Sequence, residues 1–126
     1  MKPAAHHARA CDLLGIREGA VRLIGPGEWR ELVGRGVGSF LGKADRRHHV
    51  IYVRRGQGRD MYIHELLHHL FPSRPHWWVY GAAFKLAGVQ QGRMAYGSWQ
   101  HGGRVKESKP KLIALSKRAA HRLGLA

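Results

Sequence analysis

Residues 60–71 read Asp-Met-Tyr-Ile-His-Glu-Leu-Leu-His-His-Leu-Phe, with His64 and His68 four positions apart. On an α-helix, side chains at this spacing lie on the same face, one above the other. Their imidazoles can therefore bind one metal ion, and zinc accepts imidazole nitrogen in a tetrahedral site. Glu65 follows the first histidine and can take a proton from a water molecule that the ion activates. The motif thus predicts two metal ligands and a general base.

The neighbouring residues favour an amphipathic helix over residues 60–71. Asp60 stands where it can cap the start of this helix, and residues 49–53 before it are β-branched and aromatic, which predicts a strand. An ordinary amphipathic helix with two surface histidines is the alternative. Four apolar side chains lie on the helix face opposite the histidines: Tyr62, Ile63, Leu66 and Leu70.

A third protein ligand must come from outside the motif, and three downstream residues are candidates. His76 lies beyond the breaker segment 71–75, at the start of a second predicted helix over residues 76–88. His101 lies in a loop by composition, and Glu107 precedes the last predicted helix. We favour His76, because a short loop can fold it back onto the ion. The other two require a longer return of the chain.

The rest of the chain predicts a small α+β domain. We expect a short mixed or antiparallel sheet packed on the motif helix, with further helices, in a single domain over residues 1–126. The strand over 37–42 should pair antiparallel with the strand over 49–53. The remaining pattern predicts helices over 4–14, 28–33 and 110–123 and a strand over 21–24.

Charge gives a second functional indication. The chain has 22 Lys and Arg against 8 Asp and Glu, a formal net charge of +14, and such a field attracts polyanions. We predict non-specific contact with DNA or RNA through a basic C-terminal helix at about 108–123. A solvated basic surface is the alternative. Four basic side chains of that helix are expected to face outward: Lys111, Lys117, Arg118 and Arg122.

Other features of the sequence bear on its surroundings. No window of 18 apolar residues occurs, so we expect no membrane insertion. The first residues lack the hydrophobic region of a secretory signal. Cys11 is the single cysteine and has no partner for an internal disulfide, which suits a reducing compartment. We expect a cytoplasmic monomer.

Residues 39–88 resemble the catalytic core of the zincin metallopeptidases, especially the small SprT-like and related minimal forms. In that family a strand precedes the H-E-x-x-H helix, and a short loop leads to a third histidine that an aromatic residue closely follows. This chain lacks the family's usual glycine beside the third histidine and its cysteine-rich zinc ribbon. The matching parts here are residues 39–43, the strand over 49–53, the motif over 64–68, and His76-Trp77-Trp78.

The resemblance implies a zinc-dependent peptidase that uses Zn²⁺ as its cofactor. Its ligands would be His64, His68 and His76, and Glu65 would act as the base and later as the acid. The minimal gluzincins are a rival resemblance, in which Glu107 would have to be the third ligand.

The resemblance also implies that residues 49–53 form an edge strand beside the metal. An exposed sheet edge offers unpaired N–H and C=O groups to an extended peptide. On this interpretation Val50, Ile51 and Tyr52 bind the substrate. An ordinary internal strand is the alternative.

Amide hydrolysis also needs a hydrogen-bond donor for the oxyanion. Tyr80, Tyr96 and His101 are candidates, and we favour Tyr80. We therefore expect a peptidase, and its charge favours nucleic-acid-associated proteins as substrates. One rival hypothesis is a basic nucleic-acid-binding protein with a structural or non-catalytic metal site. A second rival is a metal-dependent hydrolase that acts on a non-peptide amide.

Overall fold

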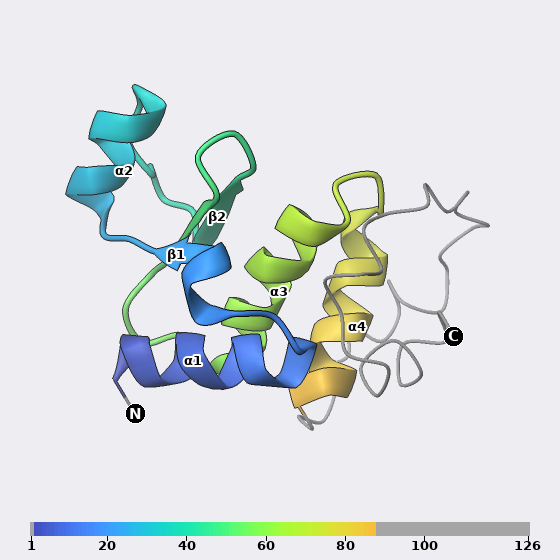
Figure 1. Cartoon of the computed structure of the whole chain (residues 1–126). Coiled ribbons are helices and arrows are strands. Elements are labelled where there is room, and N and C mark those ends of the chain that lie inside the picture. Colours follow the sequence, from blue (N-terminus) through green and yellow to red (C-terminus); the bar gives the residue numbers. More distant parts are fainter. Residues whose placement is uncertain (1, 88–126) are drawn as a thin grey trace.

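The computed structural model describes residues 2–87, and this part of the chain has an α+β fold. Figure 1 shows α3 in the middle of the molecule, with α4 on one side and the sheet and α2 on the other. The predicted coarse class is therefore confirmed. In chain order the elements are α1 (Pro3–Leu14), the 3-10 helix η1 (Glu18–Ala20), β1 (Arg22–Leu23), α2 (Pro26–Val33), β2 (Gly42–Asp45), β3 (Val50–Val53), α3 (Arg59–Leu70) and α4 (His76–Ala87).

The predicted helices within residues 2–87 agree with α1 to α4 to within two residues at each end. Both α1 and α2 begin with proline, whose fixed φ suits the first helical position. The predicted cap of α3 is wrong. The helix begins after Gly58, and no side chain makes a capping hydrogen bond there. Asp60 lies in the first turn instead, where its charge still complements the helix dipole.

The strand predicted over residues 37–42 is also wrong in position. The strand is Gly42–Asp45, and the residues before it form a turn. Gly38 adopts a φ of 58°, and the Phe40 N–H donates to the Val37 carbonyl at 3.4 Å. A positive φ does not fit an extended strand, so the extended segment starts only at Gly42.

The sheet among the described residues has three strands in the order β1-β3-β2. β1 runs parallel to β3, and β2 runs antiparallel to it. Gly42 lies opposite Val53, and Asp45 lies opposite Val50. β3 is therefore the inner strand of this sheet, and β2 lies at its margin.

This order corrects the prediction that residues 49–53 offer a free edge to a substrate. Val50, Ile51 and Tyr52 are buried, and β3 is paired with β1 on one side and β2 on the other. The backbone groups of Val50, Ile51 and Tyr52 are thus used within the sheet, and an extended peptide has no access to them. Residues 50–53 therefore form an internal strand, as the alternative interpretation has it.

Side chains of β3 alternate between two hydrophobic clusters on opposite faces of the sheet. Ile51 and Val53 belong to the cluster that contains residues of α1, α3 and α4. Val50 and Tyr52 belong to the cluster around Trp29 of α2. Successive strand residues point to opposite faces, so a strand buried on both faces reads as a continuous apolar run. This burial fixes the sheet against α3, which carries the motif.

The last described helix, α4, follows α3 after a short loop and packs against it. The Phe71 N–H donates to the Leu67 carbonyl at 2.7 Å, and the Trp78 N–H donates to the Pro75 carbonyl at 3.0 Å. Ala82 and Ala83 of α4 are buried in the shared core. Small side chains allow close approach of two helices, so the start of α4 lies near the middle of α3.

The helices between residues 2 and 87 do not have the length and apolar character that a membrane crossing requires. The cytoplasmic location and the monomeric state stay predictions. The predicted basic helix at about 108–123, with its four outward basic residues, lies outside the described residues.

Candidate metal centre

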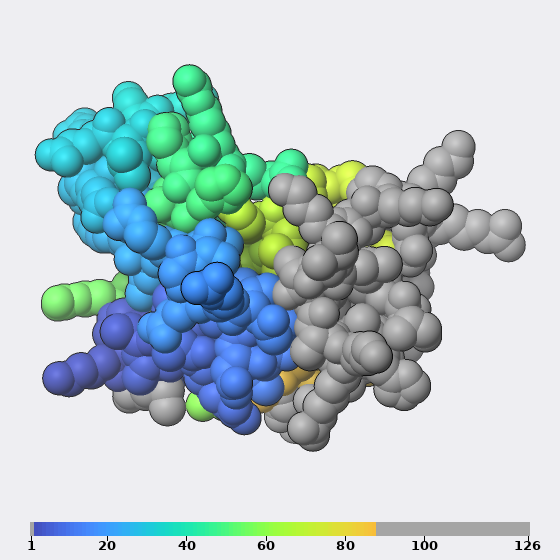
Figure 2. All heavy atoms as spheres, in the orientation of Figure 1, coloured from blue at the N-terminus to red at the C-terminus, as the bar shows by residue number. Residues whose placement is uncertain are grey.

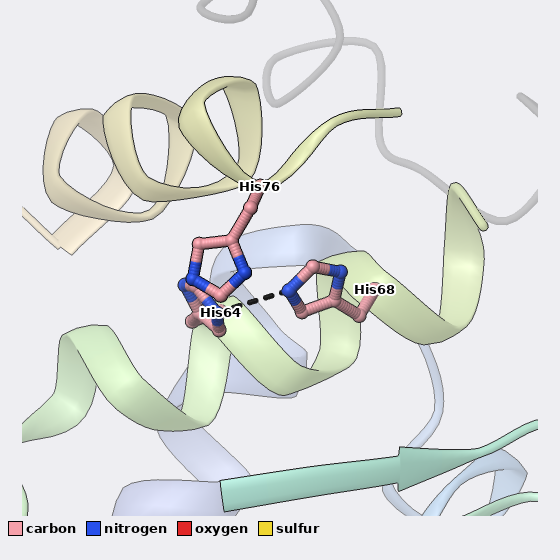
Figure 3. A group of neighbouring side chains, drawn as sticks. All are labelled: His64, His68 and His76. Carbon is pink, nitrogen blue, oxygen red and sulfur yellow. Dashed lines mark hydrogen bonds between the residues drawn. The ribbon is translucent and has the colours of Figure 1, made fainter. Parts of the chain in front are cut away.

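Three histidines from two consecutive helices converge on one point. His64 and His68 lie one turn apart on α3, and His76 is the first residue of α4. One ring nitrogen from each lies within 4.8 Å of the other two. Figure 3 shows His76 directed from α4 towards the two histidines of α3. The predicted three-histidine set is thus brought together, as a group that could hold a metal ion.

The spacing of the nitrogen atoms fits a shared ion. The Nε2 atoms of His64 and His68 are 3.0 Å apart. Two ligands of a tetrahedral zinc, each with a Zn–N bond of about 2.0–2.1 Å, have nitrogens about 3.3 Å apart. His76 approaches both rings, with centroids 4.7 Å from His64 and 5.1 Å from His68. The rings are tilted rather than stacked, which leaves their nitrogen edges free to converge.

The histidines are neutral in this environment. Burial lowers the pKa of His64 to about 3, with further contributions from His68 and His76. Burial and the neighbouring His76 lower the pKa of His68 to about 4. Burial also lowers the pKa of His76. A metal ligand must offer an unprotonated nitrogen, so these shifts suit metal binding.

Exposure increases from one ligand to the next. His64 is buried, His68 is half-buried and His76 is exposed. The centre is therefore anchored in the core on the α3 side and open on the side of His76. A catalytic metal site needs an open position for water or substrate, and this gradient supplies a direction from which they can enter.

The Glu65 carboxyl is buried, with an exposed fraction of 5%. Burial raises its pKa to about 7, close to the value that suits a general base at neutral pH. The carboxyl lies against the margin strand β2, where Gly42 is its close neighbour. Figure 2 shows the segment that contains β2, in green, beside the yellow-green atoms of α3.

Tyr80 lies one turn after His76 on α4. Its ring centroid is 4.6 Å from that of His64 and 4.5 Å from that of His76. Phe84, a further turn along, stacks on the Tyr80 ring at 6.3 Å. The aromatic ring thus forms one wall of the histidine cluster, and the role of Tyr80 as the oxyanion donor stays a prediction.

His69 is the neighbour of a candidate ligand but lies apart from the centre. It follows His68 by one position, which is about 100° around the helix axis. Its Nε2 atom lies 3.3 Å from Nδ1 of His49, just before β3. One face of α3 therefore carries the candidate metal ligands His64 and His68. Another face carries His69, which lies beside His49.

One neighbour of the site was not predicted from the sequence. Gly42 was assigned to a strand, but its contact with Glu65 was not foreseen. A glycine inside a strand often marks a close approach of another group, and this was the available signal. The other candidates lie outside residues 2–87: His101 and Glu107 as ligands, and Tyr96 as an oxyanion donor.

Comparison of the chain with protein-family models, curated proteins and solved structures finds no match. The chemistry of the centre is therefore inferred from its own residues.

Proposed function

We propose that the protein is a zinc-dependent peptidase of the zincin type, which hydrolyses peptide bonds with Glu65 as the general base. One observation carries this proposal: three histidine nitrogens lie within 4.8 Å of one another, and the residue after the first histidine is a buried glutamate. Neutral imidazoles suit zinc. A bound zinc ion would polarise a carbonyl group and lower the pKa of a water molecule.

Each residue then has a definite role. His64, His68 and His76 hold the ion. The Glu65 carboxylate takes a proton from the attacking water and returns it to the leaving amine. A bound cation would lower the pKa of this carboxyl from its metal-free value of about 7 and so favour the carboxylate that accepts the proton. Tyr80 is the proposed hydrogen-bond donor to the oxyanion, supported by the closeness of its ring to His64 and His76.

We propose that an extended peptide substrate pairs with the outer side of β2. The Arg54 N–H donates to the Leu41 carbonyl at 2.7 Å, so Leu41 and Arg54 form a hydrogen-bonded pair. In an antiparallel ladder such pairs alternate with pairs whose backbone groups point outward. Gly42 and Ala44 therefore turn their N–H and C=O groups away from β3, and Gly42 lies beside Glu65. An extended peptide can pair with these groups.

Metal content is the first test. The purified protein should hold about one zinc per chain, and His64→Ala, His68→Ala or His76→Ala should each remove most of it, because two ligands hold the ion weakly. His69→Gln is a matched control on the same helix and should keep the zinc. Zinc that survives His76→Ala but is lost in Glu107→Ala or His101→Ala would assign the third ligand elsewhere. A wild-type chain without metal refutes the proposal.

Catalysis is the second test. Glu65→Gln keeps the shape of the side chain but cannot accept a proton. It should retain zinc and lose hydrolysis of an unfolded protein such as casein by several orders of magnitude. The readout is the release of soluble peptides, with zinc content measured on the same samples. Equal turnover in wild type and variant would remove Glu65 from the mechanism.

A further inference from the structure

We propose that Gly42 is a positioning residue, whose missing side chain leaves the space in which the Glu65 carboxyl lies beside the histidines. This inference rests on the proposed function, because it assigns to β2 a part in placing the general base. It adds a residue outside the H-E-x-x-H motif, 23 positions before Glu65 in the sequence.

The geometry at Gly42 is tight. A Cβ atom built on this glycine would lie 2.6 Å from Oε2 of Glu65, 2.8 Å from its Cγ and 2.9 Å from its Cδ. All three distances are well inside ordinary carbon contact of about 3.5–4.0 Å. By contrast, a Cβ on Gly27 or Gly36 would meet nothing within 4 Å. The three atoms nearest to that position therefore all belong to the Glu65 side chain.

The backbone does not explain the glycine. Four described glycines have positive φ: Gly15, Gly34, Gly38 and Gly56. Gly42 is not among them and pairs with Val53 in a regular antiparallel ladder. Any residue can adopt that conformation, and glycine weakens a strand. What glycine supplies here is room, and the room is used by the carboxyl.

An added methyl group would move the carboxyl more readily than the strand. β2 is held by its ladder to β3, whereas the clashing atoms belong to the free part of a side chain. The expected result is a displaced carboxyl on an intact fold. The three nearest atoms belong to Glu65 and not to a histidine, so metal binding should survive. A misplacement of about 1 Å in a catalytic group can reduce the rate about 100-fold.

The test begins with Gly42→Ala, with Gly36→Ala as the matched control. Gly42→Ala should hold one zinc per chain and lower kcat about 10- to 100-fold, with KM within about 2-fold of wild type. Gly36→Ala adds the same methyl group in open space and should change neither. A rise in KM with kcat unchanged would mean that the methyl group disturbs substrate pairing, and would overturn the positioning role.

A double-mutant cycle combines Gly42→Ala with Glu65→Ala, and Glu65→Ala removes all three clashing atoms. In the wild-type background Gly42→Ala should lower Tm by about 2–6 °C and shift the visible absorption of the Co²⁺-substituted protein. In the Glu65→Ala background, Gly42→Ala should change neither the Tm nor the Co²⁺ absorption. An equal fall in Tm in both backgrounds would show that the methyl group distorts β2 itself, and would overturn the inference.

The two proposals can fail separately. A chain that binds Zn²⁺ and Co²⁺ but cleaves no protein refutes the peptidase. The role of Gly42 is then decided by the Co²⁺ spectra and the Tm cycle alone. An unchanged spectrum and Tm in Gly42→Ala would overturn it. A chain that binds neither metal refutes both.

Discussion

Glu65 and the three histidines show how burial acts on single residues of opposite chemistry. Burial raises the pKa of the Glu65 carboxyl and lowers the pKa values of His64 and His68. In each case the uncharged form is favoured, because a low-dielectric interior penalises charge. In the metal-free centre the histidines are therefore neutral at pH 7, and the carboxyl is mostly uncharged below pH 7. A bound cation would favour the charged carboxylate of Glu65 and the neutral imidazoles of the histidines.

The raised pKa of Glu65 predicts that Glu65→Gln changes how the free energy of unfolding depends on pH. In the metal-free protein the pKa of Glu65 is raised from 4.5 to about 7. Its stabilising contribution is therefore complete below about pH 4.5 and is lost as the pH rises to about 7. Glu65→Gln removes that loss. The free energy of unfolding of the variant should therefore rise relative to that of wild type as the pH rises, by about 2–3 kcal/mol at pH 8.

Urea unfolding in the presence of a chelator, at pH 5 and at pH 8, measures the effect. His64 and His68 respond in the other direction, since their lowered pKa values give stability that is lost as the pH falls below 6.5. Both proteins carry these histidines, so they cancel in the comparison. A variant that differs from wild type equally at both pH values would contradict a raised pKa.

At the scale of residues, the sequence predicted the local part of the site. His64, Glu65 and His68 share one helix, so their spacing alone brings them together. The short loop before His76 favours this residue as the third ligand over His101 and Glu107. Gly42 could not be found in this way. Its contact with Glu65 depends on how the sheet packs against α3, and sequence periodicity carries no information on that packing.

At the scale of elements, the proposed function makes the position of β2 decide where an extended peptide would bind. The register of β2 and β3 turns the Ala44 N–H outward. Ala44→Pro removes that donor and no hydrogen bond to β3, and proline is tolerated at a sheet margin for this reason. We expect kcat/KM for peptides to fall about 10-fold or more, because a backbone hydrogen bond to the substrate is lost.

Ala44→Ser is the matched control, because it keeps the N–H and should retain activity within about 3-fold. Circular dichroism and zinc content establish that both variants are folded and hold metal. Unchanged kcat/KM in Ala44→Pro would place the substrate away from β2.

The elements themselves were easier to predict than their order. The apolar run at residues 50–53 indicated a strand, and it is one. The sequence did not predict that β1 would pair with it in parallel and so make it internal. Parallel pairing joins segments that are distant in the chain, and no local pattern encodes which strands become neighbours.

At the scale of the whole molecule, charge is the dominant feature. The formal net charge of the chain is +14. Residues 2–87 contain 14 Lys and Arg and 7 Asp and Glu, which leaves +7 for this part and +7 for the rest of the chain. Of the described acids, Asp12 pairs with Arg9, and Glu28 pairs with Arg22. A basic excess on both parts favours polyanions as partners.

We therefore expect binding of DNA or RNA with little sequence preference and strong dependence on salt. The affinity should fall with a log–log slope of roughly −0.9 per phosphate contact on duplex DNA. Replacing Lys111, Lys117, Arg118 and Arg122 with glutamine should flatten this slope and leave the zinc content unchanged. Fluorescence anisotropy with a labelled oligonucleotide across a salt series measures it. No binding at about 50 mM salt would leave the charge as a solvated surface.

The placement of the three ligands on two consecutive helices also bears on the order of folding. His64, His68 and His76 fall within 13 residues, so the contacts that capture an ion are local and form early. The contact between Gly42 and Glu65 needs the sheet to be docked on α3, which closes a longer loop. On the proposed function, a folding chain could therefore bind its ion before Gly42 has positioned the Glu65 carboxyl. During that interval it would carry its ion without the means to cleave its neighbours or itself.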